Sequence, residues 1–335
     1  MCWQVMADVA LNFRLRSSSL TSGDDKRISR HALEYLVDST QHTIAFLGEQ
    51  ILVDLPILLS VWNANSRWLH SDSEQFCHYC FEVDQIPLDK KRGISRNGLS
   101  AFLDIPFETV RRRAEKLIER GILISRPDGL VCASIGKAFT TDFRDIEQFN
   151  ADLVAKLYGR LLADGYERKL PDWVIVHTGA EFPRARPQWV RALTRASVEY
   201  LASIFSHMAR ALGLNFLQTM IVLTILKRNI EHLIATPDHY SDIKVSPDSV
   251  RRGIARKDVA QALRIPPETA RRHISSLIAQ GFLIERKDGL VTPEAVIARL
   301  DGLRQSNVRL VAAMLNMLEE LEHFIRDQSG HRHAC

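Results

Sequence analysis

The sequence predicts a mainly α-helical protein that contains one small unit twice. Residues 92–131 and 252–291 align without a gap, each residue of the first segment with the residue 160 positions later, and about half of the aligned pairs are identical. A match of this length marks a duplicated structural unit. Both segments read as a short helix, a tight turn, a second helix with the sequence Thr-x-Arg-Arg, and a two-stranded hairpin. This order is typical of a winged helix-turn-helix, so we expect two such units in tandem, each a three-helix core plus a β-hairpin wing.

The duplication extends to the helices around each unit. The run from Leu58 to Asn65 is echoed 164 positions later by the run from Val222 to Asn229, and an amphipathic helix follows each hairpin. Each half is therefore predicted as two helices, a helix-turn-helix, a hairpin and a long helix. The long flanking helices have wide apolar faces that must pack on one another, across halves or across subunits. We therefore expect a pseudo-twofold arrangement of the halves.

These patterns also predict where each region begins and ends. A polar stretch ends a mobile N-terminal segment, and prolines mark a connector between the halves. The predicted regions are the mobile segment 1–28, the first winged-helix half 29–164 with its helix-turn-helix and wing at 92–133, the connector 165–187, the second winged-helix half 188–328 with its helix-turn-helix and wing at 252–292, and the tail 329–335.

The second helix of each unit has an apolar and a polar face. In the first unit Ser95 is placed to cap the first helix, Asp104 lies in the turn, and Pro106 suits the first position of the second helix. Helical spacing then separates the two faces. The inward set is Val110, Ala114 and Leu117, and Ala270, Ile274 and Leu277; the outward set is Glu108, Thr109, Arg112 and Lys116, and Glu268, Thr269, Arg272 and Ser276.

A hairpin follows each second helix. Gly121 and Gly281 are expected to end the helices, and an Asp-Gly pair between β-rich runs is a strong hairpin signal. Arg126, Arg286 and Lys287 are placed near the hairpin tips. They are expected either to reach phosphate or a minor groove, or to lie on an ordinary solvated surface.

Positive charge is concentrated on the two units. Residues 92–131 hold eight Lys and Arg against five Asp and Glu, and residues 252–291 hold eight against four, whereas the whole chain has a net charge of only +4. A phosphate-binding surface requires such segregation, although surface helices also carry arginine for other reasons.

At these residues the chain resembles the bacterial winged helix-turn-helix regulators of the MarR and Crp/Fnr kinds. Phe-Glu-Thr-Val-Arg-Arg at 107–112 and Pro-Glu-Thr-Ala-Arg-Arg at 267–272 look like the Crp/Fnr recognition helix, Ser-Arg-Glu-Thr-Val-x-Arg. The resemblance covers about forty residues in each half. The arginine before the glutamate is replaced here by Phe107 or Pro267, so the DNA sequence preference of that family is not carried over. Flanking helices, and the lack of a preceding cyclic-nucleotide barrel, make the whole chain more similar to MarR regulators, in which such helices form the dimer.

The resemblance implies a role for each outward residue. Glu108 and Glu268 would accept from cytosine and Arg112 and Arg272 would donate to guanine, with Thr109 and Thr269 on phosphate. Other roles stay open. The glutamates are also placed to interact with the helix dipole, and Arg111 and Arg271 either bind phosphate or pack their stems on the apolar face.

The sequence therefore predicts a regulator of transcription that binds double-stranded DNA. Two units in one chain suit an imperfect palindrome, because the second helices differ: Arg113, Glu115 and Lys116 become His273, Ser275 and Ser276. The predicted DNA-binding residues are Glu108, Thr109, Arg111, Arg112, Arg113, Lys116, Arg126, Glu268, Thr269, Arg271, Arg272, His273, Ser276, Arg286 and Lys287. A homodimer and a small-molecule effector stay open, the latter bound near Trp62, Trp68, Phe205 and Met208 unless these are core residues. The alternatives are a replication-initiator or partition-type DNA-binding protein, and a winged-helix module that binds protein.

Other classes of function are not favoured. The sequence has no phosphate-binding glycine loop, no His-Glu-x-x-His and no nucleophile elbow, so we expect neither an enzyme nor a cofactor. Cys77, His78 and Cys80 form a weak metal candidate without a second Cys-x-x-Cys. Five scattered cysteines, no evident signal peptide and no apolar run long enough to span a bilayer favour a cytoplasmic protein at the nucleoid, without a membrane partner.

Overall fold

The computed structural model describes residues 22–48, 51–72, 75–76, 78–79, 86–133, 143–166, 175–176, 184–185, 189–234 and 247–332. Over these residues the protein is mainly α-helical, which confirms the predicted class, and its strands form three two-stranded antiparallel sheets. No helix in the described ranges is both long and apolar enough to cross a membrane.

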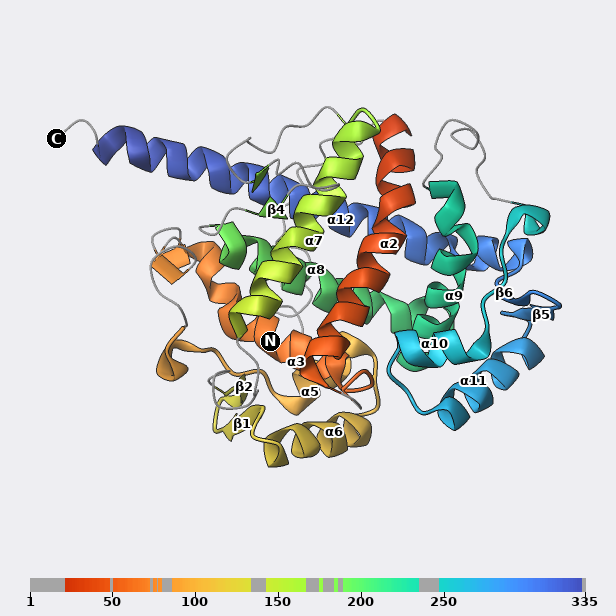
Figure 1. The fold of residues 1–335 in the computed structure, drawn as a ribbon. Coiled ribbons are helices and arrows are strands. Elements are labelled where there is room, and N and C mark those ends of the chain that lie inside the picture. The colour runs from red at the N-terminus through yellow and green to blue at the C-terminus, as the bar shows by residue number, and fades with distance from the viewer. Residues whose placement is uncertain are drawn as a thin grey trace.

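The elements of the two halves follow the same order (Figure 1). The first half consists of α2 (Ser22–Leu47), α3 (Leu55–Ser66), the 3-10 turns η1 (Arg67–Ser71) and η3 (Leu88–Lys90), α5 (Arg96–Leu103), α6 (Phe107–Glu119), β1 (Leu123–Arg126), β2 (Gly129–Cys132) and α7 (Phe143–Ala163). The second consists of α8 (Val190–Ala211), α9 (Phe216–Ile234), η7 (Asp248–Val250), α10 (Arg256–Ala262), α11 (Pro267–Ala279), β5 (Ile284–Arg286), β6 (Gly289–Val291) and α12 (Glu294–Arg332).

Three predicted boundaries need correction or fall outside the described residues. The mobile segment 1–28 was predicted too long, because α2 begins at Ser22 and Ile28 is fully buried; residues 1–21 lie outside the described residues. The tail 329–335 was also predicted too long, since α12 continues to Arg332. Most of the connector 165–187 lies outside the described residues, but β3 (Ile175–Val176) and β4 (Arg184–Ala185) form a short antiparallel pair within it.

Helices of each half pack on one another and also on helices of the other half. Within the first half α2 packs on α7, and within the second α8 packs on α12. Between halves α3 and α7 pack on α8, while α9 and α12 pack on α2. Each of these contacts between halves has a counterpart in which the halves are interchanged, whereas α5 packs on α8 without comparable packing of α10 on α2 in the described ranges; Figure 1 shows α12 crossing behind α2 and α7. The first helix of each half thus packs on the last helix of its own half and on two helices of the other half. A pseudo-twofold arrangement of the halves predicts this pattern.

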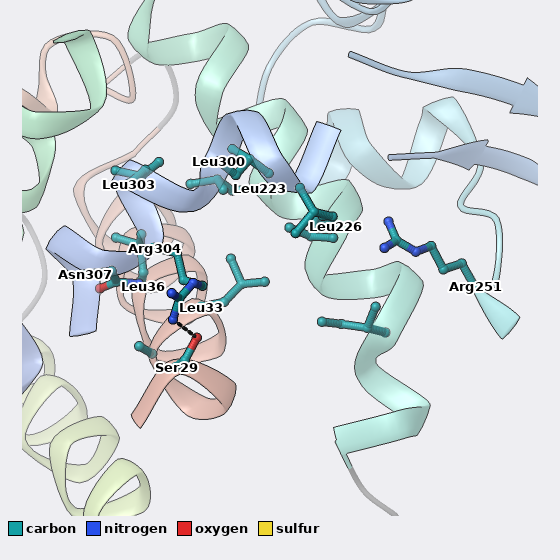
Figure 2. A pocket seen from close by; sticks show the side chains of 13 residues that line it. Ser29, Leu33, Leu36, Leu223, Leu226, Arg251, Leu300, Leu303, Arg304 and Asn307 are labelled. Carbon is teal, nitrogen blue, oxygen red and sulfur yellow. Dashed lines mark hydrogen bonds between the residues drawn. The ribbon is translucent and has the colours of Figure 1, made fainter. Parts of the chain in front are cut away.

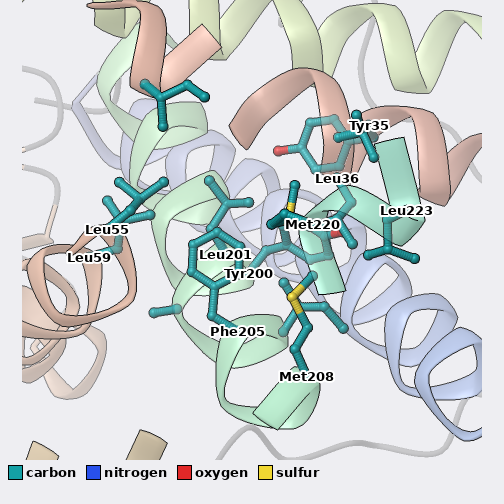
Figure 3. Packing of buried hydrophobic residues seen from close by; sticks show 14 of the residues in the cluster. Tyr35, Leu36, Leu55, Leu59, Tyr200, Leu201, Phe205, Met208, Met220 and Leu223 are labelled. Carbon is teal, nitrogen blue, oxygen red and sulfur yellow. The ribbon is translucent and has the colours of Figure 1, made fainter. Parts of the chain in front are cut away.

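The centre of this arrangement is a pair of tyrosines. Tyr35 of α2 and Tyr200 of α8 are both buried, with ring centroids 5.1 Å apart (Figure 3). The Tyr35 hydroxyl donates to Ser197 Oγ at 2.9 Å, and the Tyr200 hydroxyl donates to Asn307 Oδ1 at 2.6 Å. Both tyrosines stand in the sequence Glu-Tyr-Leu, 165 positions apart, so the duplication includes these first helices as well.

Candidate nucleic-acid interface

We define the first unit as residues 92–132 and the second unit as residues 252–292. In the first unit Ser95 caps α5 as predicted, because its Oγ accepts from the backbone N–H of Gly98 at 3.0 Å. The turn that follows contains Asp104 with a φ of 54°, and Arg264 takes its place in the second unit with a φ of 47°. Pro106 precedes the first residue of α6 and is its N-cap, one position earlier than predicted.

The buried faces of α6 and α11 are those predicted. Val110, Ala114 and Leu117 are at most 1% exposed, as are Ala270, Ile274 and Leu277. Because helical periodicity fixes the opposite face once one face is buried, the Arg-bearing faces of both helices lie outward. Figure 1 shows α6 and α11 along the same lower edge of the molecule, away from the upper ends of α2 and α7.

A buried asparagine links the first hairpin to the preceding helix. Asn65, at the end of α3, donates from Nδ2 to the carbonyl oxygens of Arg92 (2.7 Å) and Leu130 (3.3 Å), and its Oδ1 accepts from the N–H of Cys132 at 2.8 Å. These bonds give the Arg92 carbonyl and the Cys132 N–H a partner, and they add a second donor to the Leu130 carbonyl, which also accepts from the N–H of Ile94. The hairpin is thus fixed relative to α3.

The second unit repeats these bonds. Asn229, at the corresponding place in α9, donates to the carbonyls of Arg252 (2.7 Å) and Leu290 (3.1 Å) and accepts from the N–H of Thr292 (2.9 Å). The sequence echo between Asn65 and Asn229 therefore has a structural cause that sequence reasoning did not identify.

The hairpin tips are held by the Asp-Gly pairs. Asp128 Oδ2 accepts from the N–H of Gly93 at 3.0 Å, and Asp288 Oδ2 accepts from the N–H of Gly253 at 2.8 Å. A side chain at Gly93 or Gly253 would place a Cβ within 2.7 Å or 2.5 Å of the aspartate's backbone oxygen, so the approach requires glycine.

The hairpin arginines face the protein, against the expectation that they reach phosphate. Arg126 donates to both carboxylate oxygens of Asp128 (2.8 and 2.5 Å) and to the carbonyl of Leu88 (2.7 Å). Arg286 donates to both oxygens of Asp288 and to the carbonyls of Asp248 (2.8 Å) and Arg251 (2.5 Å). These hydrogen bonds lower the pKa of both aspartates. The wing candidate that remains exposed is Lys287.

The glutamates at the start of α6 and α11 are paired with arginine. Arg111 Nε donates to Glu108 at 2.9 Å and its Nη1 to Glu115 at 3.1 Å. Arg271 donates to both oxygens of Glu268, at 2.8 and 2.6 Å, which lowers the pKa of Glu268. All these groups are exposed, so the pairs contribute little stability, but they orient the carboxylates on the surface.

Arg112 of α6 and Arg272 of α11 occupy identical positions, are exposed and carry no such partner. Neither makes a hydrogen bond or an ion pair with any residue that the structure describes. The same is true of the Lys116 ammonium, one turn after Arg112. Thr109 and Thr269 are half-buried beside this face.

Three further predicted residues are only partly exposed. Arg113 donates from Nη1 to Asp54 at 2.8 Å and is 27% exposed, so it joins α6 to the residue before α3. His273, its counterpart, is half-buried; burial and then the nearby Arg272 lower its pKa. Ser276 is half-buried and accepts from Gln280 Nε2 at 2.9 Å.

Sequence reasoning missed a difference in the first helices of the units. Arg256 of α10 forms a two-point ion pair with Glu285 of β5, at 2.9 and 2.8 Å. The aligned residues in the first unit are Arg96 and Ser125, so this pair has no counterpart there, and Arg96 Nε is buried without a hydrogen-bond partner among the described residues. The alignment at 160 positions already shows this difference, because Ser125 aligns with Glu285.

Within the described ranges the candidate metal ligands do not form a metal site, and the candidate effector-pocket residues belong to the core or pack against it. Among the described residues no group of three or more His, Cys, Asp or Glu side chains is arranged to hold a metal ion; Cys77 and Cys80 lie outside the described residues, and His78 packs edge-on against Tyr79. Phe205 and Met208 belong to the buried core (Figure 3), and Trp62 and Trp68 pack against it.

Comparisons of the chain with family models, with curated proteins and with solved structures gave no match.

Proposed function

We propose that the two units are winged helix-turn-helix modules that bind double-stranded DNA, and that the protein is a transcriptional regulator acting without catalysis. The observation that carries this proposal is the repeated exposure of Arg112 and Arg272 at the same position of α6 and α11, the two helices that Figure 1 shows along one lower edge of the molecule. An exposed arginine without a protein partner is available for the two acceptors of a guanine edge.

The surrounding residues support the same assignment. The α6 and α11 helices each have an apolar side fixed to the unit, and each hairpin is tied to the helix before the unit by Asn65 or Asn229. A rigid scaffold of this kind suits a helix that reads base edges, because recognition requires fixed geometry. Lys116 in the first unit and Lys287 in the second add exposed charge for phosphate.

We further propose that the units read unequal half-sites. Phe107, at the start of α6, is 40% exposed and suits contact with a thymine methyl group, whereas Pro267 stands at the start of α11. In this proposal the corrected interface excludes Arg113, Arg126 and Arg286, since their guanidinium groups are used within the protein.

The test is selection of duplexes from a random library by the full chain, followed by footprinting at fixed salt. We expect an enriched motif with two different halves. The double variant Arg112→Ala/Arg272→Ala should lose the enrichment while keeping the circular dichroism of the parent. Failure to enrich any motif, or an unchanged motif with the double variant, would reject the proposal.

A further inference from the structure

A cavity of about 170 Å³ opens between α2, α9 and α12 (Figure 2). Its wall is aliphatic and comes from all three helices, with no aromatic ring in it. The aliphatic lining residues are Ala32, Leu33, Leu36, Leu223, Leu226, Ile230, Ile297, Leu300 and Leu303. The helices belong to different halves, since α2 is in the first and α9 and α12 are in the second.

Arg304 places a guanidinium group at one end of this cavity, where it is ion-paired with Asp25 and Asp301. Its Nε donates to Asp301 at 2.8 Å, and its Nη1 lies 3.4 Å from both Asp25 and Ser29 Oγ. Its Nη2 makes no hydrogen bond to a residue that the structure describes. Figure 2 shows its guanidinium beside Ser29 and well separated from Arg251, the other arginine of the lining.

The corresponding place in the first half carries a larger side chain. In the alignment at 164 positions Leu223 corresponds to Leu59, but Leu226 corresponds to Trp62. Trp62 is partly buried and packs against the core. An indole therefore adds volume in the first half where the second half has a leucine at the cavity wall.

From this geometry we infer that the cavity binds a small aliphatic monocarboxylate. The chain would lie among the leucines, and the carboxylate would accept from Arg304 and from Ser29 Oγ. Charge-assisted bonds of this type give orientation, while the aliphatic wall gives affinity. An apolar cavity of about 150 Å³ is large enough for benzene, so a body of about six to eight carbon atoms fits.

Occupancy would act on the second unit through Arg251. Its Nη1 donates to the carbonyl of Thr292, just after β6, and its own carbonyl accepts from Arg286 Nη2 at 2.5 Å. The cavity lining is therefore bonded directly to β5 and to the residue that follows β6. Only the effect of this coupling on DNA binding rests on the proposed function; the binding site and the coupling to the second unit do not.

The binding site is tested by calorimetric titration of the full chain with octanoate, using 1-octanol as the uncharged control. We expect octanoate to bind, and Arg304→Gln to weaken it by about tenfold or more without weakening 1-octanol. Leu226→Trp, which copies the first half, should abolish binding of both. Ile297→Phe serves the same purpose if Leu226→Trp does not fold, as judged by circular dichroism. No binding of octanoate to the parent, or equal binding by folded cavity-filling variants, would overturn the inference.

The link to the second unit is measured by amide hydrogen exchange with and without octanoate. We expect the change in protection to be larger in residues 252–292 than in residues 92–132. A change confined to the first unit, or none in either unit, would overturn the coupling. Neither experiment contains DNA, so both can succeed if the proposed function fails; footprinting with octanoate then shows whether the second half-site alone responds.

Discussion

The two units have the same internal bonds and different exposed faces. Asn65 and Asn229 make the same three hydrogen bonds. The hairpin aspartate of each unit accepts from the N–H of the glycine at its second position, Gly93 or Gly253. On the outward side Lys116 is replaced by Ser276. The shared bonds fix each hairpin relative to the preceding helix and to the start of the unit, whereas some of the exposed side chains differ.

This difference separates residues that specify the fold from residues that are available for binding. Identity at aligned positions is not by itself a sign of a binding role: Arg126 and Arg286 are identical in sequence and both bond within the protein. Arg112 and Arg272 are also identical, yet no partner among the described residues explains them.

Replacing either buried asparagine is expected to have the largest effect. Asn65→Ala and Asn229→Ala each leave backbone groups without partners, so each should lower the free energy of unfolding by about 3 kcal/mol. Urea denaturation measures this, with the exposed Gln280→Ala as a control expected to change it by less than about 0.5 kcal/mol. A much smaller loss for one of the two asparagine variants would show that the two bond sets are not equivalent.

Single arginine variants separate the two exposed faces. Arg112→Ala and Arg272→Ala are each expected to weaken specific DNA binding by about 1–3 kcal/mol, each through a different half of the site. Gel shifts at fixed salt with each half-site mutated in turn measure this. Arg111→Ala, which removes an arginine already paired with Glu108 and Glu115, is the matched control and should cost less. Unaffected binding by both single variants would refute the assignment.

A pH effect distinguishes the first helices of the halves. His42 of α2 stacks on Phe149 with ring centroids 3.3 Å apart, and burial lowers its pKa from 6.5 to about 4. The unfolded chain therefore takes up the proton more readily, and stability should fall as the pH drops from about 6.5 to about 4. Because the ring is partly exposed, we expect a loss of about 1 kcal/mol.

Denaturation at pH 7 and pH 4.5 checks this expectation. His42→Gln should lose less stability between the two pH values than the parent does. The residue 165 positions later, His207, is exposed and bonds through Nδ1 to the carbonyl of Ser203 at 2.8 Å, so the environment of His42 is specific to the first half. An identical pH profile for His42→Gln and the parent would contradict the assignment.

The smallest expected effect is on salt dependence. Lys116→Ser should reduce the slope of log affinity against log salt by about one, and Ser276→Lys should increase it by about the same amount. Binding isotherms over a range of salt concentrations measure both slopes. Opposite shifts would link the difference between the units to phosphate contacts, and unchanged slopes would place Lys116 outside the interface.

Local patterns predicted much of the fold and part of the site. The cap at Ser95, the buried faces of α6 and α11 and the two hairpins were predicted because helical periodicity and turn residues act over a few positions. The roles of Arg113 and Arg126 were not, because Asp54 and the Leu88 carbonyl lie far from them in the sequence. The sequence alone predicts a solvated hairpin tip, whereas in the structure the turn at Leu88 lies beside it.

Helical periodicity also did not predict which helices of one half pack on which helices of the other. An apolar helix face shows that a partner is needed but not which helix supplies it. The one readable clue was the Glu-Tyr-Leu sequence shared by α2 and α8, which marks both first helices as copies of one element. Their tyrosines meet at the centre of the molecule.

The two units belong to one polypeptide, whose halves interleave through α3 on α8 and α9 on α2. Two separate subunits with different exposed faces would form mixtures of like and unlike pairs, but here each molecule contains one of each by covalent linkage. A particle with two dissimilar ends also has a direction. Under the proposed function it would lie on an asymmetric site in one orientation only, and so could distinguish upstream from downstream.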